Sequence, residues 1–343
     1  KIKALEQDFA SAASAVKQAD LLLFSYPVYT FIAPSQLHRF FELLKASGLS
    51  LDGKYAAQIS TSKHFYDITA HRYVQDLCQD LGLKYIGGLS ADMDDLLQER
   101  GQKQARAFLE YLRWSMEQDS YLSFPAPQPD FVPVAATALP EDLSEKPGDV
   151  VIVTDASAGD TNLLAMIARF RAKCLRKTRV VNIREYPFRG GCLGCFNCAA
   201  TGKCIYKDGF DVFLREKIQT AEAIIMAFTV KDHSMGASFK LYDDRQFCNG
   251  HRTVTIGMPV GYLISGNYSQ ETNLQMILEG RAQVGCNILT GVATDEFDPD
   301  AAIDLVVAHE LCHIAHHDHS SAFYALLASV LPDHKERAKL LKE

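Results

Sequence analysis

The fold is decided by residues 149–175, DVVIVTDASAGDTNLLAMIARFRAKCL. The first part, DVVIVTD, is rich in β-branched residues and predicts a strand. The second part, TNLLAMIARFRAKCL (161–175), has the apolar spacing of an amphipathic helix. A strand that runs through a short loop into a helix opens a βαβ unit. This stretch therefore predicts an α/β protein with a parallel sheet.

The same alternation of strand and helix patterns continues towards the end of the chain. We expect further strands at TRVVNIRE (178–185), AIIMAFT (223–229), RTVTIGMP (252–259) and NILTGVAT (287–294), and helices around 210–220 and 301–317. Five strands that alternate with helices are typical of a parallel sheet covered on both faces.

The first half repeats the second from its middle onwards. ADLLLFSYPVY (19–29) aligns without gaps on AEAIIMAFTVK (221–231), an offset of 202, and LGLKYIGGLS (81–90) matches VGCNILTGVA (284–293). Three strands are recognisable in this half, LLLFSYP, YAAQIST and KYIGGLS, so the counterparts of the first two strands are missing. Either the chain is truncated or something else completes the first copy. We favour truncation, because the sheet edge beside LLLFSYP is uncovered.

The proline distribution sets the domain boundaries. Residues 120–148 hold six of the twelve prolines, which disfavour a regular helix and favour an extended linker. We therefore expect a partial domain at 1–119, a complete domain at 149–325 and a helical tail at 326–343. A helix over 98–118 is expected to cover the sheet of the first domain.

Composition excludes several classes of partner. The 343 residues include 48% hydrophobic and 22% charged residues, as in a globular protein with two domains. A net charge of −7 argues against nucleic acid as a partner. Because no apolar run is long enough to span a membrane, we expect no membrane partner and a cytoplasmic location. In that reducing compartment, the nine cysteines are not expected to form disulfides.

Four of the cysteines form a cluster in GGCLGCFNCAATGKC (190–204). Their spacing is C-x2-C-x2-C-x5-C, and they are Cys192, Cys195, Cys198 and Cys204. Zinc sites usually use two separated cysteine pairs, whereas a compact run with a fourth cysteine nearby suits a 4Fe-4S cluster. The sequence therefore favours iron–sulfur binding at these four cysteines, with zinc and unmetallated thiols as alternatives.

The loop TDASAGDTN (154–162) ends the first strand of the complete domain and leads into a helix. Such a loop can bind an anion with its free N–H groups. Its candidate binding residues are Thr154, Ser157, Gly159, Asp160, Thr161 and Asn162. The alternative is a structural role, in which Asp160 or Thr161 caps the helix.

Together the strand pattern, this loop and the cysteine run resemble the iron–sulfur flavoproteins, within the flavodoxin-like group of NAD(P)H-dependent FMN reductases. The resemblance implies tandem flavodoxin-like domains, each with a sheet of order 2-1-3-4-5. It also implies FMN, a 4Fe-4S cluster on the four cysteines, and NAD(P)H as a co-substrate.

The resemblance implies flavin contacts after the third strand, where the family has Pro-Val-Tyr. The first domain has Pro27, Val28 and Tyr29 there, and the second has Thr229, Val230 and Lys231. Met258, Pro259 and Gly261 are expected after the next strand of the second domain. Two departures weaken the flavin pocket of the second domain: Ala156 replaces the family's arginine, and Asp160 puts a carboxylate where the phosphate belongs. We therefore expect the flavin in a complete first domain and the cluster in the second.

The predicted function is electron transfer between FMN, reduced by NAD(P)H or a ferredoxin-type donor, and the cluster. Alternatives are a cluster-free NAD(P)H:quinone or FMN reductase and a non-catalytic scaffold subunit of a redox complex. Partners would be small-molecule or protein electron donors and acceptors. The chain would form a homo-oligomer or a pseudo-dimer of its two domains.

One further motif is HELCH within VVAHELCHIAHHDH (306–319), a formal HExxH in which His309 and His313 share a helix face, with His319 beyond. A zinc protease would use Glu310 to activate water. We favour a surface helix instead, because Ile303 and Val307 begin an apolar stripe on the opposite side.

Overall fold

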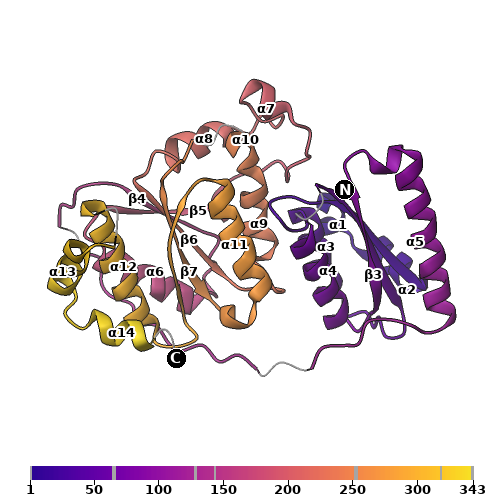
Figure 1. The fold of residues 1–343 in the computed structure, drawn as a ribbon, viewed down its shortest axis with the longest axis horizontal. Coiled ribbons are helices and arrows are strands. Elements are labelled where there is room, and N and C mark those ends of the chain that lie inside the picture. Colours follow the sequence, from indigo (N-terminus) through magenta and orange to yellow (C-terminus); the bar gives the residue numbers. More distant parts are fainter. Residues whose placement is uncertain are drawn as a thin grey trace.

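The computed structural model describes residues 2–63, 67–126, 130–142, 144–250, 254–316 and 319–340. The side chains of residues 250, 310, 311, 313–315 and 340 lie outside the description. Two α/β units are joined by the 120–148 linker (Figure 1). The described part of that linker contains neither helix nor strand, as its prolines predict.

The second unit contains a five-stranded parallel sheet. Its order, β5-β4-β6-β7-β8, is the predicted 2-1-3-4-5 order, so the fold class is confirmed. The strands are β4 (Val150–Thr154), β5 (Thr178–Asn182), β6 (Ala223–Thr229), β7 (Pro259–Ser265) and β8 (Ile288–Thr294).

Helices cover both faces of this sheet. One face packs against α6 and α12 through Leu163, Met166 and Ile303, and the other packs against α8, α9 and α11. The helices are α6 (Thr161–Lys173), α7 (Asn197–Thr201), α8 (Phe210–Lys217), α9 (Gly236–Arg245), α10 (Phe247–Gly250), α11 (Thr272–Val284), α12 (Pro299–Ala315), α13 (Ser321–Val330) and α14 (His334–Leu340), with short 3-10 turns η2 (Ile183–Glu185) and η3 (Tyr268–Gln270).

The first unit has a three-stranded parallel sheet, ordered β1-β2-β3. Its strands are β1 (Leu21–Pro27), β2 (Tyr55–Ser62) and β3 (Lys84–Asp92). Its helices are α1 (Ile2–Gln7), α2 (Ala10–Gln18), α3 (Ser35–Ala46), α4 (Ile68–Asp80) and α5 (Glu99–Glu117), with the 3-10 turn η1 (Asp95–Leu97). The predicted helix over 98–118 covers this sheet as expected, because Leu112 of α5 packs on Ala57 and Ile86.

One predicted strand boundary needs correction. The strand expected at 252–259 begins only at Pro259, because residues 254–257 form turns and Gly257 has a φ of +73°. The sheet instead uses the continuous apolar run after Met258, as a strand buried on both faces does. Met258, Pro259 and Gly261 therefore lie towards the amino end of β7, away from the carboxyl ends of the strands. The boundary expected at 325/326 falls inside α13.

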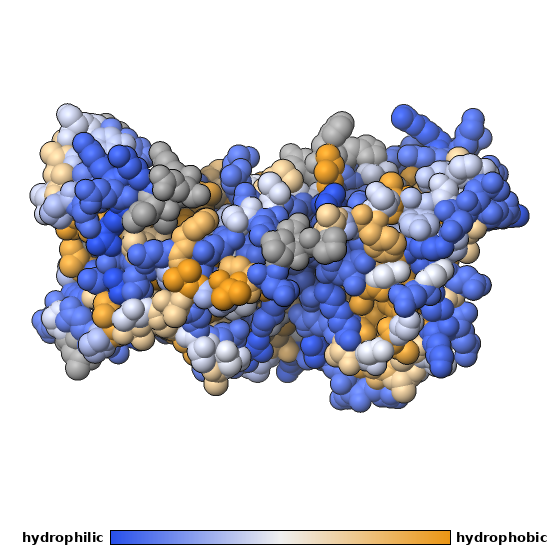
Figure 2. All heavy atoms as spheres, turned by 90° about the horizontal axis from the view of Figure 1, so that it is seen from below, coloured by the Kyte–Doolittle hydropathy of each residue, from blue (hydrophilic) through white to orange (hydrophobic). Residues whose placement is uncertain are grey.

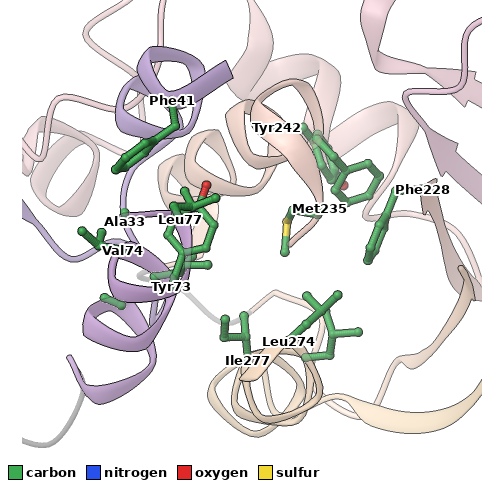
Figure 3. Close-up of a cluster of buried hydrophobic side chains, with 14 of the residues drawn as sticks. Ala33, Phe41, Tyr73, Val74, Leu77, Phe228, Met235, Tyr242, Leu274 and Ile277 are labelled. Carbon is green, nitrogen blue, oxygen red and sulfur yellow. The ribbon is translucent and has the colours of Figure 1, made fainter. Parts of the chain in front are cut away.

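The two units share one apolar core. Helices α3 and α4 of the first unit pack against α9 and α11 of the second. Figure 3 shows Tyr73 and Leu77 of α4 facing Met235, Leu274 and Ile277 across this interface. Such continuous apolar packing holds the relative position of the two units more firmly than a polar interface would.

The loops that follow β1 and β6 have the same backbone. Thr30 and Phe31 have φ values of +50° and +69°, and Asp232 and His233, each 202 positions later, have +52° and +60°. Each loop is closed by a bridge, Tyr29 to Ile32 in the first unit and Lys231 to Ser234 in the second. We call them the first loop (28–32) and the second loop (230–234).

The contacts between the units are reciprocal at the same offset. The Ser35 amide donates to Asp244 Oδ2 at 2.7 Å, and the Ala237 amide donates to Glu42 Oε1 at 2.8 Å. Since 237 − 35 and 244 − 42 both equal 202, these bonds exchange partners between the units. An approximate two-fold relation of this kind is typical of the two subunits of a homodimer.

Much of the molecular face in Figure 2 is hydrophilic, with hydrophobic groups in separate patches. Among the helices within the described ranges, none is both long and apolar enough to cross a lipid bilayer.

Candidate functional site

The first loop faces the cysteine run across a cavity of about 590 Å³. The loop follows β1. Thr61 and Ser62 end the neighbouring strand β2, and Lys63 follows it. In a parallel α/β sheet, ligands bind at this carboxyl edge. The cavity is lined from the first unit by Pro27, Val28, Tyr29, Thr30, Phe31, Thr61, Ser62, Lys63 and Met93, and from the second by Cys192, Leu193, Gly194, Cys195, Phe196, Cys198, Cys204, Ile205, Tyr206, Arg245, Phe247, Cys248, Arg281 and Val284.

Tyr29 of the first loop lies against Gly194 of the cysteine loop (190–204). A Cβ on Gly194 would overlap the Tyr29 hydroxyl, and Gly194 has a φ of +60°, which favours glycine. The Tyr29 ring packs against Phe247 at 5.9 Å between ring centres. Burial, with the nearby Cys192 thiol, raises the pKa of Tyr29 above its ordinary value. The phenol therefore stays protonated and can donate a hydrogen bond into the cavity.

Gln36 fastens the start of the cysteine run to the first unit. Its Nε2 donates to the Cys192 carbonyl at 3.0 Å. Gly191 lies against the same side chain, so that a Cβ there would stand 2.7 Å from Gln36 Nε2. The cysteine loop is therefore shaped by contacts with both units.

The four predicted ligand cysteines all line the cavity. Cys192, Cys198 and Cys204 are half-buried and Cys195 is exposed. The Gly194 amide donates to Cys192 Sγ at 3.5 Å, the kind of amide–sulfur contact that tunes cluster ligands. Burial raises the pKa of the Cys192 thiol to about 11. In the part of the chain that the structure describes, no three such side chains stand in a metal-binding arrangement.

The sequence analysis missed two residues of this site. Cys248 lies outside the cysteine run in the sequence, but it is buried and lines the same cavity. Arg245 is 1% exposed, donates to the Gly190 carbonyl at 2.8 Å and pairs with Asp208 at 2.8 Å, so it ties together both ends of the cysteine loop. Neither residue can be found from the spacing of the cysteine run, because Arg245 lies on α9 and Cys248 lies on α10.

The predicted phosphate loop of the second unit binds its own carboxylate. Asp160 Oδ2 accepts from the Ser157 amide at 2.8 Å and from the Ser157 hydroxyl at 2.6 Å, and Asp160 Oδ1 accepts from Thr229 at 3.1 Å. Burial alone would raise the pKa of Asp160, but these hydrogen bonds hold it below its ordinary value. The carboxylate therefore accepts the hydrogen bonds of the Ser157 amide and hydroxyl, which an anion bound to this loop would otherwise accept.

The other predicted residues of this loop have structural partners. Thr154 Oγ1 accepts from the Ala156 amide at 3.1 Å, Gly159 lies in the turn, and Thr161 begins α6. Asp160 stands at the N-cap position of α6, but its side chain makes no cap hydrogen bond. Asn162 binds the linker instead, donating to the Val134 carbonyl at 3.0 Å.

The linker lies along this edge of the second sheet. The Val134 amide donates to the Asp295 carbonyl at 2.7 Å, and the buried Asp295 carboxylate accepts from Ser265 at 2.6 Å. In the second loop, the Val230 amide donates to the Ser265 carbonyl at 2.7 Å, and the Lys231 chain lies against Gly236. Thr229 and Lys231 are thus close to Asp160, whereas Met258, Pro259 and Gly261 are not part of this group.

The HELCH segment lies on α12. Ile303 and Val307 are buried as predicted. His309 is half-buried rather than facing open solvent: its Nε2 lies 3.2 Å from His319 Nε2, and its ring packs on Phe323 at 4.9 Å. The side chains of Glu310 and His313 are outside the described residues.

Two family models match the chain. Residues 2–91 match NADPH-dependent FMN reductase, and residues 297–343 match the YgjP-like metallopeptidase domain. The first match covers the first unit from α1 to Ala91 of β3, including the first loop, and ends before α5. The second match is at odds with the interpretation of HELCH as a surface helix.

Individual proteins match this chain either over a short stretch or at low sequence identity. An iron–sulfur flavoprotein from Archaeoglobus fulgidus is 32% identical over 73 residues, 21% of this chain, and the match spans 33% of that protein. Among solved structures, an NAD(P)H:quinone oxidoreductase from Methanothermobacter marburgensis aligns over 50% of this chain and all of its own, with 13% identity and a TM-score of 0.35. A flavodoxin, WrbA-like protein from Agrobacterium tumefaciens aligns over 56% of this chain and 99% of its own, with 10% identity and a TM-score of 0.29.

The duplication inferred from the repeat stays a prediction, which the shared loop backbone supports. The family resemblance rests on three findings: the 2-1-3-4-5 sheet, the match over residues 2–91 and the iron–sulfur flavoprotein relative. The predicted resemblance to the iron–sulfur flavoproteins and NAD(P)H-dependent FMN reductases is therefore confirmed, and residues 2–91 are FMN reductase-like.

Proposed function

We propose that the protein is a flavin oxidoreductase that transfers electrons between FMN and a 4Fe-4S cluster. The observation that carries this proposal is the cavity in which Pro27–Tyr29 of the first unit face the four cysteines of the second. The flavin ring would lie against the first loop, and Cys192, Cys195, Cys198 and Cys204 would hold the cluster.

The residues present fit the flavin ring better than its phosphate. A cavity of about 590 Å³ is in the usual range for a cofactor site, about 300–1,000 Å³. Its lining offers apolar surface from Val28 and Phe31 and hydroxyl groups from Tyr29 and Thr61. Lys63 is the exposed cation at its rim. The phosphate loop of the second unit is filled by Asp160, so we assign the flavin to the first unit.

The cysteine loop fits a cluster in its donor set. All four thiols line one cavity, and the Gly194 amide lies beside the Cys192 sulfur. When bound, FMN takes a hydride from NAD(P)H and releases electrons singly, while the cluster takes them one at a time. The chain itself would hold the two groups across the interface between the units, with Tyr29 donating a hydrogen bond into the cavity.

The remaining expectations are part of the same proposal. We propose a cytoplasmic location, a small-molecule or protein electron donor and acceptor, and NAD(P)H as co-substrate. Reciprocal contacts such as Ser35–Asp244 support a pseudo-dimer of the two units, with a homo-oligomer as the alternative. A cluster-free NAD(P)H:quinone or FMN reductase and a non-catalytic scaffold subunit are the competing functions.

The test is anaerobic purification, followed by iron, sulfide and flavin assays, a visible spectrum and reduction by NAD(P)H. We expect about four irons per chain together with FMN, and loss of iron in Cys198→Ser. Cys286→Ser is the matched control, because Cys286 is exposed and does not line the cavity. Flavin without iron would support the cluster-free reductase, and a colourless protein would support the scaffold.

A second candidate function rests on the C-terminal segment. The 3.2 Å approach of His309 Nε2 to His319 Nε2 places two nitrogen donors together on neighbouring segments, within the region that matches a metallopeptidase domain. In an HExxH helix, histidines bind zinc and the glutamate activates water. We propose a zinc site there with His313 as the third ligand.

This second candidate has its own test. Zinc content and peptide hydrolysis would be measured for the full chain and for His319→Ala, with His71→Asn in the first unit as control. About one zinc per chain that His319→Ala loses is the expected result. Equal zinc content in wild type and His319→Ala would contradict it.

A further inference from the structure

We propose that Lys240, on α9 of the second unit, is a positioning residue for the flavin-facing loop of the first unit. This inference rests on the proposed function. It assigns a role across the interface to a lysine that neither the cysteine motif nor the Pro-Val-Tyr signature includes.

The first loop needs external support because its backbone is strained. Thr30 and Phe31 both have a positive φ, +50° and +69°, and neither is glycine. A β-branched residue such as threonine is especially unfavourable in the left-handed region. Strained backbone of this kind persists only where surrounding contacts fix it, and it gathers at functional sites.

Lys240 supplies that support from the second unit. Its side chain is fully buried, and Nζ donates to the Tyr29 carbonyl at 3.0 Å and to the Thr30 hydroxyl. The Tyr29 carbonyl belongs to the peptide bond before Thr30, and the hydroxyl is on Thr30 itself. Both acceptors therefore lie where the backbone adopts the left-handed conformation. The ammonium group therefore fixes the backbone of Tyr29, the residue whose ring faces the cysteines.

Two carboxylates of α9 orient the Lys240 ammonium. Asp243 lies 2.9 Å from Nζ and Asp244 lies 2.5 Å from it, so the lysine is held by acceptors on both units. Asp244 also accepts from the Ser35 amide of the first unit. Because the whole group is buried, loss of one member would leave unpaired charge.

Arg281 completes the charge balance. It pairs with Asp243 at 2.8 Å and lines the cavity itself. Burial alone would raise the pKa of Asp243, but Arg281 and Lys240 hold it below its ordinary value. Two cations thus face two carboxyl groups, and Asp243 connects Lys240 to the cavity wall.

The second loop lacks this arrangement. At the offset of 202, the counterpart of Lys240 is His38, whose ring stacks on Tyr73 at 4.2 Å. Ion pairs with side chains of the first unit hold the second loop: Lys45 pairs with Asp232 at 2.6 Å, and Asp80 pairs with His233 at 3.0 Å. Of the two loops, the one that faces the cavity is thus the one that a buried lysine supports.

The experiment compares FMN affinity, measured by fluorescence titration, and the visible spectrum of bound flavin in full-length variants. Lys240→Met removes the clamp, and we expect FMN to bind at least about tenfold more weakly, with a shifted spectrum, because the loop loses its preorganised position. Thr30→Val removes only the hydroxyl and keeps the buried charges, so it tests the same contact if Lys240→Met does not fold. For Thr30→Val we expect about threefold to tenfold weaker binding.

Lys54→Met is the matched control, because the Lys54 Nζ donates to the carbonyls of Lys17 and Ala19 instead of the first loop. It should bind FMN as the wild type does. A folded Lys240→Met protein with wild-type affinity and spectrum would overturn the role of Lys240, and the same result for Thr30→Val would overturn the part of that role that acts through the Thr30 hydroxyl. A wild-type chain that binds no FMN would overturn the proposed function and this role with it, so the two failures are distinguishable.

Discussion

The first loop (28–32) and the second loop (230–234) share a backbone but differ in what they face. The first places Tyr29 on a cavity shared with the cysteine run. The second places Lys231 beside the predicted phosphate loop, in which the Ser157 amide and hydroxyl already donate to Asp160. One unit therefore keeps an open site where the other is closed.

This difference shows that a shared backbone conformation does not by itself preserve a binding site. The two loops share only their first residue, Val28 and Val230, and Tyr29 of the first corresponds to Lys231 of the second. On the helices that follow, Lys240 corresponds to His38. In the second unit, a single carboxylate satisfies the donors that would otherwise bind an anion. Function is thus decided by side chains on a common scaffold.

The largest effect is expected from closing the open site through Gly194→Ala. The new Cβ would overlap the Tyr29 hydroxyl and sit at a positive φ, so the cysteine loop must move. We expect the free energy of unfolding to fall by about 3 kcal/mol, from left-handed strain and overpacking together. Iron and flavin content should both fall with it, measured alongside urea denaturation.

Gly209→Ala tests the effect of left-handed backbone strain without steric overlap of the new Cβ. Gly209 has a φ of +76°, but its Cβ would be in ordinary contact, 3.7 Å from Tyr186. The control should therefore lose only about 1–2 kcal/mol and keep its cofactors. Equal effects in the two variants would show that contact between Tyr29 and the cysteine loop is unimportant.

Strands that are apolar and bounded by polar residues could be predicted from the sequence. LLLFSYP and AIIMAFT are β1 and β6 residue for residue. The alternation of strands and helices predicted a parallel sheet, whereas its order came from the family resemblance. The strand β7 was misplaced because RTVTIGMP alternates like a strand, whereas the real strand is a continuous apolar run. The local sequence pattern does not show which of two adjacent candidate strands joins the sheet.

The candidate site was predictable only in its separate parts. The cysteine run and Pro27–Tyr29 could be recognised by spacing, but they lie far apart in the sequence, and only packing of α3 on α9 brings them together. Lys240, Asp243 and Asp244 look like the solvent face of a short helix. They are buried because the first unit covers α9, which no local pattern encodes.

Opening the closed site through Asp160→Ala is expected to have a smaller effect on stability. It removes the acceptor of the Ser157 amide and hydroxyl and should cost about 1–2 kcal/mol. The freed donors should then bind inorganic phosphate, measured by isothermal titration, where the wild type binds none in this loop. Asp142→Ala is the control, because Asp142 also accepts a local amide, that of Ser144, in an exposed turn. Unchanged phosphate binding in Asp160→Ala would mean that the carboxylate is not what closes the loop.

The smallest effect concerns the second loop and its dependence on pH. Burial alone would lower the pKa of His233, but hydrogen bonds to Asp80 and Glu271 outweigh it and raise the pKa to about 10. A pKa raised on folding stabilises the protein fully below the unfolded value near 6.5, and this contribution is lost as the pH rises through 10. Because Asp80 is 40% exposed, solvent screening reduces the gain to about 1 kcal/mol.

The measurement for this loop is urea denaturation between pH 6.5 and 10. The wild type should lose about 1 kcal/mol across this range, and His233→Asn should lose less. Asparagine tolerates the φ of +60° at this position, so the substitution removes the charge without adding backbone strain. The first loop has Phe31 at the equivalent place and cannot contribute to this slope. An equal pH dependence in the variant would mean that ion pairs do not hold the second loop in place.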